Sequence, residues 1–310
     1  MANLMKTHMQ QNHLYSVFFA PRGNVRMTRL GMQIAQQYLS PFDRLIGIIG
    51  EAGSGKSMLV KGMFPGLELS NDDGGGNVRP LPLLSVDEDD GFYAPHTYHI
   101  DMRFESAFTQ MHVLAEAVQC AIDKGRRVVV EHFELLYPSL KRNAQLLIGI
   151  GEEVVITRPT LFGPLPQDLA NIVSKSLIYR KMAHTAEDLV EYCMPEGIYQ
   201  MCHHGDVKHG FYLGFDEDPK LDIGQLEEHV QEIIRQNIPI NFHDEDHITI
   251  GNTLHPCTGP RIHVRSTGEI DNFRLLKEVF YDSMEGRYLI VGLVGERWDY
   301  ETSDLNRIAF

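Results

Sequence analysis

The sequence has few of the residues that cross-link a chain or insert it into a membrane. Its 310 residues include four cysteines, which are too few and too scattered for a disulfide framework: Cys120, Cys193, Cys202 and Cys257. No window approaches the roughly 20 apolar residues that a membrane-spanning helix requires. The first residues also lack an apolar segment of the signal-peptide type. We therefore expect a reducing, cytoplasmic setting and no membrane partner.

Basic residues are also scarce. Lys and Arg number 28 against 42 Asp and Glu, which gives a net charge of −14. This acidity argues against a chain that coats nucleic acid, although a local basic patch remains compatible with it. Hydrophobic residues make up 43% and charged residues 23% of the chain, which is ordinary globular usage and argues against wholesale disorder. The length corresponds to about two domains, and homo-oligomer formation stays open.

A phosphate-binding motif follows the first buried-strand pattern. The apolar residues 44–49 predict a buried parallel strand, and residues 57–63 can begin a helix. Between them lies a match to G-x-x-x-x-G-K-[ST]: Gly50, Glu51, Ala52, Gly53, Ser54, Gly55, Lys56 and Ser57. In such a loop the backbone N–H groups and the helix N-terminus surround phosphate oxygens. Lys56 would then neutralise the phosphates of ATP, and the Ser57 hydroxyl would bind Mg²⁺.

A second buried-strand pattern ends in a carboxylate. Residues 126–133 contain three consecutive valines and then Glu131, which can lie beside the phosphate loop and approach the magnesium ion or its water shell. Apolar residues at helical spacing over 107–124 predict a helix before this strand, and Gly125 stands at its expected C-cap. Farther upstream, 17–20 is expected as an added strand and 27–39 as a covering helix. The alternation predicts an α/β P-loop domain with a mainly parallel, doubly wound sheet.

The first half resembles the uridine kinase-like group of P-loop kinases over about residues 44 to 160. Besides the loop, the resemblance rests on the segments 90–93 (Asp-Gly-Phe-Tyr), 101–108 and 128–131. It implies that Asp90 is the general base toward the acceptor hydroxyl and that Asp101 and Arg103 contact the substrate. Asp90 ends an acidic run that follows an expected strand over 83–86. The family's Glu-Gly pair is Glu131-His132 here, and only Arg180 and Lys181 stand in for an arginine-rich lid.

The second half has a different signature. Residues 210–215 predict a strand, and the segment after Pro219 predicts an amphipathic helix with Leu221, Leu226, Val230, Ile233 and Ile234 on one face. The strand 247–251 and the run 254–270, with its Thr-Gly-Glu-Ile, follow. Over about 185 to 295 this half resembles the second additional domain of alanyl-tRNA synthetases, an α+β module that also occurs in free-standing editing proteins.

The resemblance implies a zinc site. In the editing enzymes, an H-x-x-x-H pair on a helix joins a cysteine and a histidine, and here His184, Asp188, Cys257 and His263 correspond to these ligands. The Cys257–His263 spacing is C-x₅-H, which is two residues longer than in the family. Residues 184–189 could instead belong to a kinase lid. Rival groups are the pair His243 and His247, and the Cys202-His203-His204 cluster, which could also be a polar strand end.

The favoured interpretation joins a kinase-like domain, residues 1–178, to the editing-like module, residues 179–310. It predicts an ATP-dependent phosphotransferase with Lys56, Asp90 and Glu131 as catalytic groups, Mg²⁺ and Zn²⁺ as cofactors, and a nucleoside-like or hydroxy amino acid acceptor. One alternative is an ATP-regulated trans-editing deacylase with mischarged tRNA as its partner. Another is a nucleotide-dependent binding module without turnover.

Overall fold

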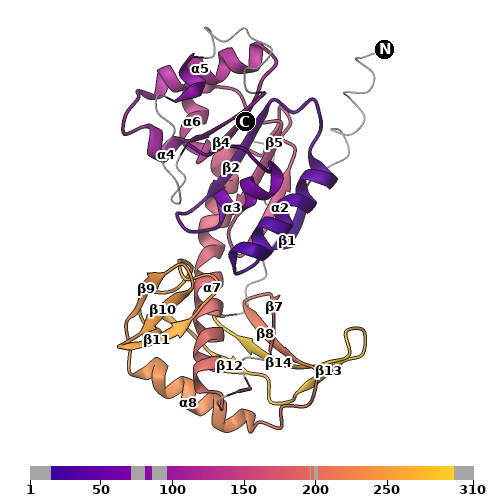
Figure 1. Cartoon of the computed structure of the whole chain (residues 1–310), viewed down its shortest axis with the longest axis vertical. Helices are drawn as coiled ribbons and strands as arrows, with labels where there is room; N and C mark the ends of the chain where they lie inside the picture. Colours follow the sequence, from indigo (N-terminus) through magenta and orange to yellow (C-terminus); the bar gives the residue numbers. More distant parts are fainter. Residues whose placement is uncertain (1–14, 71–80, 86–95, 196, 199–201, 297–310) are drawn as a thin grey trace. The chain divides into compact units, whose positions relative to one another are not determined.

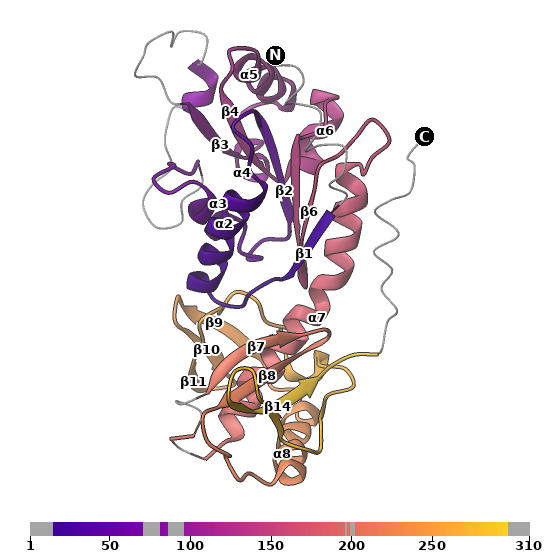
Figure 2. The same cartoon turned by 90° about the vertical axis from the view of Figure 1, so that its right-hand side faces the viewer.

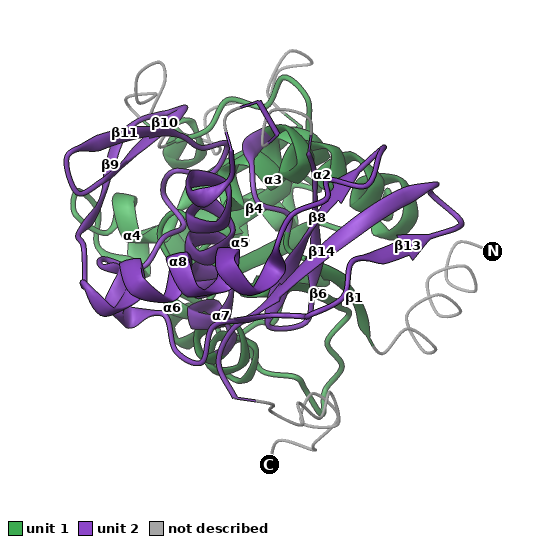
Figure 3. Cartoon of the chain, turned by 90° about the horizontal axis from the view of Figure 1, so that it is seen from below, with its two compact units in different colours: residues 1–20, 25–175, 301–310 green, residues 21–24, 176–300 purple. Residues whose placement is uncertain are grey.

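The chain divides into two compact units. The computed structural model describes residues 15–70, 81–85, 96–195, 197–198 and 202–296. Within this part, unit 1 contains residues 15–20 and 25–175, and unit 2 contains residues 21–24 and those from 176 onward (Figure 3). The division after residue 175 falls inside one long helix, three residues before the boundary expected from the sequence.

A six-stranded mixed sheet forms the centre of unit 1. Its strand order is β1-β6-β5-β2-β4-β3. The four strands β2 to β5 are mutually parallel, whereas β6 runs antiparallel to β5 and β1 antiparallel to β6. The bounds are β1 Tyr15–Phe19, β2 Leu45–Gly50, β3 Thr97–Asp101, β4 Arg127–Glu131, β5 Leu146–Ile150 and β6 Glu153–Thr157. Every residue of β2 is buried, as expected for a central parallel strand covered on both faces.

Helices cover both faces of this sheet. Helices α2 (Asn24–Tyr38) and α3 (Lys56–Met63) pack with the strands in one apolar cluster. Helices α5 (Met111–Asp123) and α6 (Phe133–Leu140), together with the first part of α7 (Pro166–Cys193), pack in another. Figure 2 shows α2 and α3 on one side of the sheet and α6 and α7 on the other. Unit 1 is therefore a three-layer α/β structure, whose sheet carries the glycine loop at the end of its central strand.

Two local expectations for unit 1 are wrong. The helix expected over 107–124 begins only at Met111, because the short α4 (Met102–Glu105) and a turn precede it. Residues 82–85 form the 3₁₀ turn η1 (Pro82–Ser85) instead of a strand. Gly125 does follow α5, and its φ of 74° lies in the left-handed region that a helix C-terminus uses. The strand β1 and the helix α2 occur close to their expected positions.

Unit 2 is built around the second part of α7. A five-stranded antiparallel sheet has the order β12-β14-β8-β7, with β13 paired to β14, and a three-stranded sheet has the order β11-β10-β9. Figure 1 shows these elements in orange and yellow around α7. Helix α8 (Ile223–Arg235) follows Asp222, whose carboxylate accepts a hydrogen bond from the N–H of Gln225 as an N-cap. Leu221 therefore lies outside the helix that was expected to include it. The strands are β7 His203–Val207, β8 Gly210–Phe215, β9 Ile240–Asp244, β10 His247–Ile250, β11 Thr253–Pro256, β12 Arg274–Leu275, β13 Phe280–Asp282 and β14 Arg287–Leu293, with the 3₁₀ turn η3 at Thr267–Glu269.

Helix α7 is the longest of the described helices, with 28 residues. It carries several charged residues, and none of the helices in the described part of the chain has the length and hydropathy needed to cross a bilayer. Its second part is buried on two sides. Met182, Ala183, Ala186, Leu189 and Val190 face the apolar core of unit 2, while polar residues on other faces of the helix form the cluster described below.

Candidate functional site

The glycine motif forms a turn between β2 and α3. β2 ends at Gly50 and α3 begins at Lys56, and the first three loop residues, Glu51 to Gly53, are exposed. Gly53 and Gly55 have φ values of 77° and 97°, which residues with a side chain rarely adopt. The strand, the loop and the helix N-terminus thus have the order and exposure that an anion requires at such a site.

Lys56 and Ser57 meet Glu131 from the neighbouring strand. The Ser57 hydroxyl donates a hydrogen bond of 3.0 Å to Oε1 of Glu131, and Nζ of Lys56 lies 3.9 Å from Oε2. Nζ also donates to the carbonyl oxygen of Glu51 at 2.9 Å. These contacts arise because β4 pairs directly with β2, which brings the end of each strand to one edge of the sheet. A cation, a hydroxyl and a carboxylate therefore converge beside the loop.

His99 is a further member of this group that the sequence did not reveal. Nδ1 of His99 accepts from the backbone N–H of Ser70 at 3.1 Å, so the proton of a neutral ring lies on Nε2. Nε2 is 3.2 Å from Oε1 of Glu131 and donates to it. The side chains of His99 and Glu131 are both completely buried or nearly so. His99 thus fixes the orientation of the carboxylate, and only the pairing of β3 with β4 brings the two together.

Burial and the charges of neighbouring groups shift the pKa values of Glu131 and Lys56. Burial opposes ionisation of Glu131, but the hydrogen bonds from His99 and Ser57 and the charge of Lys56 more than offset it and hold the pKa of that carboxyl below its usual value. Burial lowers the pKa of the Lys56 ammonium, and the charges of Glu131 and Asp101 oppose this shift. An anionic ligand at the loop would add to the charges that favour the protonated lysine.

The three other residues expected near the acceptor have different placements. Asp90 lies outside the described residues. Asp101 ends β3, and its Oδ1 accepts hydrogen bonds from the N–H groups of Arg103 and Phe104, so it caps α4. The Arg103 side chain is exposed. The charges of Asp101 and Arg103 both act on the loop lysine, since Asp101 raises the pKa of Lys56 and Arg103 lowers it.

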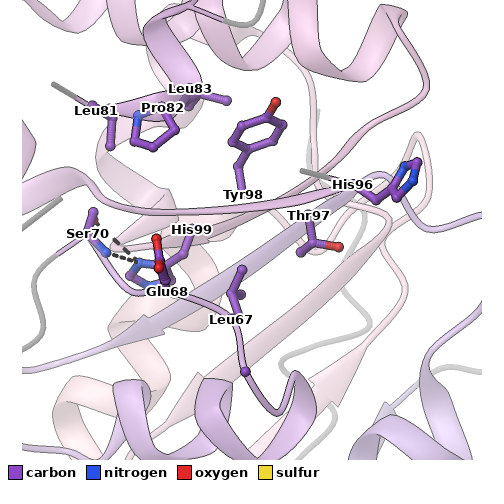
Figure 4. Close-up of a pocket in the computed structure, with 11 residues that line it drawn as sticks. Leu67, Glu68, Ser70, Leu81, Pro82, Leu83, His96, Thr97, Tyr98 and His99 are labelled. Atoms are coloured by element: carbon purple, nitrogen blue, oxygen red, sulfur yellow. Dashed lines mark hydrogen bonds between the residues drawn. The ribbon is translucent and has the colours of Figure 1, made fainter. Parts of the chain in front are cut away.

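A cavity of about 420 Å³ lies next to His99. Figure 4 shows the side chains that line it, with Ser70 hydrogen-bonded to His99. Its lining is apolar at Leu67, Leu81 and Leu83, while Tyr98 adds an aromatic ring. Glu68, Ser70, His96 and His99 add polar groups. A mostly apolar cavity with a few polar side chains is typical of a small-molecule site.

In unit 2, one face of α7 carries a row of titratable side chains. His184, Glu187, Asp188 and Glu191 are spaced i, i+3, i+4 and i+7, which places them on one side of the helix. All four are buried. Cys257 and His263 come from the segment after β11 and meet this face. His184, Asp188, Cys257 and His263 have ligand atoms that all lie within 4.8 Å of one another.

Three of the six separations among these four ligand atoms are close to those around a tetrahedral zinc ion. Sγ of Cys257 lies 3.3 Å from Nε2 of His184 and 3.3 Å from Nε2 of His263. Nε2 of His263 is 3.6 Å from Oδ2 of Asp188. Ordinary zinc–sulfur and zinc–nitrogen bond lengths place the ligands of a tetrahedral site about 3.3–3.6 Å apart. Oδ2 of Asp188 is buried without a hydrogen bond, which is the kind of atom that an ion would satisfy. The longer C-x₅-H spacing does not separate the two ligands.

The surrounding groups orient the two imidazoles. Nδ1 of His184 lies 3.2 Å from Oε2 of Glu187, a carboxylate partner of the type that fixes zinc-binding histidines. The Thr185 hydroxyl donates to the carbonyl oxygen of Lys181, so it accepts from Nδ1 of His263 at 3.2 Å. Both rings therefore present Nε2 to Cys257. The N–H of Gly259 also donates to the Cys257 sulfur at 3.3 Å.

Burial disfavours the charged form of each of the four groups when no ion is bound. It raises the pKa of the Cys257 thiol, with a contribution from Asp188, and raises that of Asp188 well above its usual value, with contributions from Glu191 and Glu187. Burial lowers the pKa of both His184 and His263. Neutral imidazoles can bind a metal at once, whereas the thiol and the carboxyl would release protons to it.

Arg22 is the main part of this site that the sequence did not indicate. Its guanidinium is 1% exposed, lies 3.5 Å from Glu187 and 2.5 Å from Asp206, and donates to the carbonyl oxygen of Gly205. Arg22 belongs to the short segment 21–24 of unit 2, so only the folded chain brings it to α7. Glu187 and Glu191 could have been noticed from their helical spacing to His184.

The rival sequence interpretations have different outcomes. His243 and His247 stand on an exposed hairpin of β9 and β10, where Nδ1 of His247 contacts Asp244 at 2.8 Å. Among the described residues, neither belongs to a group of possible metal ligands. The 184–189 segment lies in the buried C-terminal part of α7, in unit 2, and not in a lid of unit 1. In the Cys202–His204 segment, Cys202 and His204 do join a cluster with Glu191.

Comparisons with known proteins add no assignment. No protein-family model matches the chain, and no curated protein matches its sequence. Two crystal structures of the ornithine aminotransferase from Toxoplasma gondii are similar with TM-scores of 0.25 and 0.21, at 9% and 7% identity, each covering 84% of this chain and 70% of that one. Likeness at this level carries no argument about fold or function.

Proposed function

We propose that unit 1 is a P-loop nucleotide-binding domain that transfers a phosphoryl group from ATP to a small molecule. The observation that supports this most is the meeting of Lys56 and Ser57 with Glu131 beside the loop. In P-loop enzymes a lysine contacts the β- and γ-phosphates, and a hydroxyl and an acidic residue hold the magnesium ion. The sequence motif, the left-handed glycines and the uridine kinase-like segments all favour the same assignment.

The residues of unit 1 have separate tasks in this proposal. Bound Mg²⁺ would neutralise charge on the phosphates. The N–H groups at the start of α3 bind phosphate oxygens, and Lys56 exchanges its contact with Glu51 for one with the nucleotide. Ser57 and Glu131 hold the metal, and His99 positions Glu131 through its Nε2–H. Asp90 is the proposed base that takes the proton of the acceptor hydroxyl.

The cavity beside His99 is the proposed acceptor pocket. His99 lines it together with Tyr98 and with Ser70, whose backbone N–H donates to Nδ1 of His99. Its volume of about 420 Å³ suits a nucleoside-sized molecule. The apolar leucines would contact a base or an aliphatic group, and the polar side chains would bind hydroxyl groups.

Nucleotide binding and turnover test this proposal. Lys56→Ala should weaken Mg·ATP binding by about 10- to 100-fold, the loss expected for one or two charge-assisted hydrogen bonds. Lys61→Ala, on the same helix, is the matched control and should bind as the wild type does. Nucleosides and hydroxy amino acids should then be screened for acceptor-stimulated ADP formation, with Asp90→Asn as the inactive variant. Unchanged ATP affinity in Lys56→Ala would overturn the nucleotide site.

A second candidate function is favoured by the ligand set on α7. We infer that His184, Asp188, Cys257 and His263 hold a zinc ion, as in the editing module that the second half resembles. A cavity of about 390 Å³ borders three of these ligands and could admit an aminoacyl group or an RNA 3′ end. Under this alternative the chain is a trans-editing deacylase for mischarged tRNA, with ATP as a regulator. Zinc would supply Lewis acidity toward an ester carbonyl.

Deacylation of mischarged tRNA, with and without added Zn²⁺, distinguishes this function from the kinase. Zinc-dependent release of the amino acid, lost in Cys257→Ser, would support it. A release rate equal to that of the tRNA alone would exclude it. If ATP binds but neither an acceptor nor a tRNA is turned over, the remaining interpretation is a nucleotide-dependent binding module.

A further inference from the structure

A second group of metal-binding side chains lies next to the proposed zinc ligands in unit 2. Glu191, Cys202 and His204 have ligand atoms within 4.8 Å of one another. Nδ1 of His204 is 3.2 Å from Oε1 of Glu191, and the Cys202 sulfur lies 3.7 Å from both that oxygen and Nε2 of His204. The two contacts of His204 use different ring nitrogens, and one ion can bind only one of them, so the separations among one set of three ligand atoms are bounded by 4.8 Å. The distance of 3.7 Å between Cys202 and Glu191 is close to the roughly 3.3–3.6 Å expected between ligands of one tetrahedral ion.

We propose that Glu191, Cys202 and His204 hold a second divalent transition-metal ion, separate from the ion assigned to Cys257 and its partners. A thiolate, an imidazole and a carboxylate together suit zinc and do not suit Mg²⁺ or Ca²⁺, which prefer oxygen ligands alone. Nothing in the proposed kinase or deacylase activity requires this site.

The buried charge on α7 supports a second cation. Glu187, Asp188 and Glu191 bring three carboxyl groups into one buried region, with exposed fractions of 1%, 4% and 8%. The guanidinium of Arg22 is shared between Glu187 and Asp206. The imidazole of His204 contacts both Glu187 and Glu191. Buried carboxylates need a counter-charge. Glu191 lies outside the tetrad of His184, Asp188, Cys257 and His263, so an ion on that tetrad would leave Glu191 to be balanced by the His204 imidazole or by a cation bound with it.

His255 gives an independent indication of a ligand here. It is 6% exposed, and its Nε2 is buried without a hydrogen-bond partner. A ring nitrogen of His255 lies within 4.8 Å of carboxyl oxygens of Asp188 and Glu191. An imidazole nitrogen beside two carboxyl groups, with no hydrogen bond, is a group that a metal ion would satisfy. His255 therefore borders one ligand of each set, Asp188 of the tetrad and Glu191 of the second set.

The second site would keep a coordination position open. It offers three protein ligands, the number found in catalytic zinc sites, and all three line the cavity of about 390 Å³ that also borders the tetrad. The side chain of His204 is 38% exposed, so the ion would be reachable from solvent. The class of ligand expected at the open position is an oxygen donor, such as water or the carbonyl or carboxylate of a small molecule.

Metal stoichiometry tests the proposal on the full-length protein. After zinc loading and removal of the excess, elemental analysis should find two zinc ions per chain in the wild type. Cys202→Ser and His204→Gln should each lose one and retain one. Cys257→Ser should retain the ion of the second site, and Cys193→Ser, a cysteine outside both sets, should keep two. Thermal unfolding of each variant confirms that the loss does not follow from misfolding.

Cobalt substitution gives a second readout. Each cysteine ligand produces a thiolate-to-cobalt charge-transfer band, so the titration of the metal-free wild type should show two components. Cys202→Ser should remove one and Cys257→Ser the other. A wild type that binds one ion, lost in Cys257→Ser and retained in Cys202→Ser, would overturn the second site and leave the first intact. A wild type that binds no zinc would reject both.

Discussion

The Cys257 sulfur lies 3.3 Å from Nε2 of His184, although the two residues are 73 positions apart in the chain. The contact joins the segment after β11 to the buried face of α7. It brings together a thiol and an imidazole with no opposite charges to hold them, since burial raises the pKa of Cys257 and lowers that of His184. A shared metal ion would bind both groups, because thiolate and imidazole are preferred zinc ligands.

Removal of the metal should therefore destabilise unit 2. At a free zinc concentration of about 100 times the Kd, the bound ion contributes about 2.7 kcal/mol to the free energy of unfolding. Chelation should therefore lower the unfolding temperature of this unit by roughly 10 °C. Calorimetry of the full chain with and without EDTA measures the shift, and added zinc should reverse it. Cys257→Ser should show the lowered transition without EDTA. If EDTA leaves the unfolding temperature of the wild type unchanged, the result would contradict a metal ion bound by His184, Asp188, Cys257 and His263.

The Glu131 group should produce an acid-dependent loss of stability in unit 1. The pKa of Glu131 is held below its ordinary value of 4.5 in the folded protein. Its contribution is therefore fully present above 4.5 and is lost as the pH falls toward the lowered folded pKa, because the unfolded chain then binds the proton first. Between pH 7 and pH 3, the unfolding temperature should fall more steeply in the wild type than in Glu131→Gln. Glu116→Gln, an exposed change on α5, should follow the wild type.

Local patterns predicted the loop of unit 1 because its parts are contiguous. The apolar run, the glycines and the helix start of residues 44–63 specify a strand, a turn and a helix without help from the rest of the chain. The contacts of Glu131 with Ser57 and His99 depend instead on strand order, since β4 must lie between β2 and β3. No local periodicity encodes that order, so His99 had no signal in the sequence.

The metal ligands of unit 2 divide in the same way. His184 and Asp188 are four residues apart, and their position on one helix face follows from that spacing alone. The segment with Cys257 and His263 could be matched to them only through the resemblance to a known module. Arg22 lies more than 160 residues upstream of Glu187 in the chain, and its burial against that carboxylate is a product of the fold. Nothing in its local sequence distinguishes it from a surface arginine.

Close packing of α2 against α3 makes Gly62 a sensitive position. A Cβ at Gly62 would lie 2.1 Å from the carbonyl oxygen of Thr28, and one at Gly31 would lie 2.3 Å from that of Leu59. Gly62→Ala should therefore force the helices apart and cost about 1–3 kcal/mol. Gly224→Ala, at an exposed helical position near only the Asp222 side chain, should instead be neutral or stabilise the protein by up to about 1 kcal/mol. Denaturant unfolding measures the free energy of unfolding of both variants, and equal changes would contradict close packing of α2 against α3 at Gly62.

Removal of one partner from the buried pair of Asp43 and Arg158 should destabilise the protein more than removal of one partner from an exposed ion pair. The guanidinium donates to both carboxylate oxygens, at 2.8 and 2.9 Å, and also to the carbonyl oxygens of Tyr38 and Gln145. Asp43 is 1% exposed and Arg158 is 7% exposed. Asp43→Ala leaves a buried cation without its carboxylate and should cost about 3–5 kcal/mol.

Glu232→Ala breaks an exposed pair with Arg235, whose side chains are 56% and 63% exposed, and should change stability by less than about 1 kcal/mol. Chemical denaturation of the two variants measures both effects. Since Asp43 precedes β2 and does not reach the glycine loop, the folded fraction of Asp43→Ala should bind Mg·ATP with wild-type affinity at low temperature. A loss of affinity that precedes unfolding would show that the pair acts on the nucleotide site as well as on the fold.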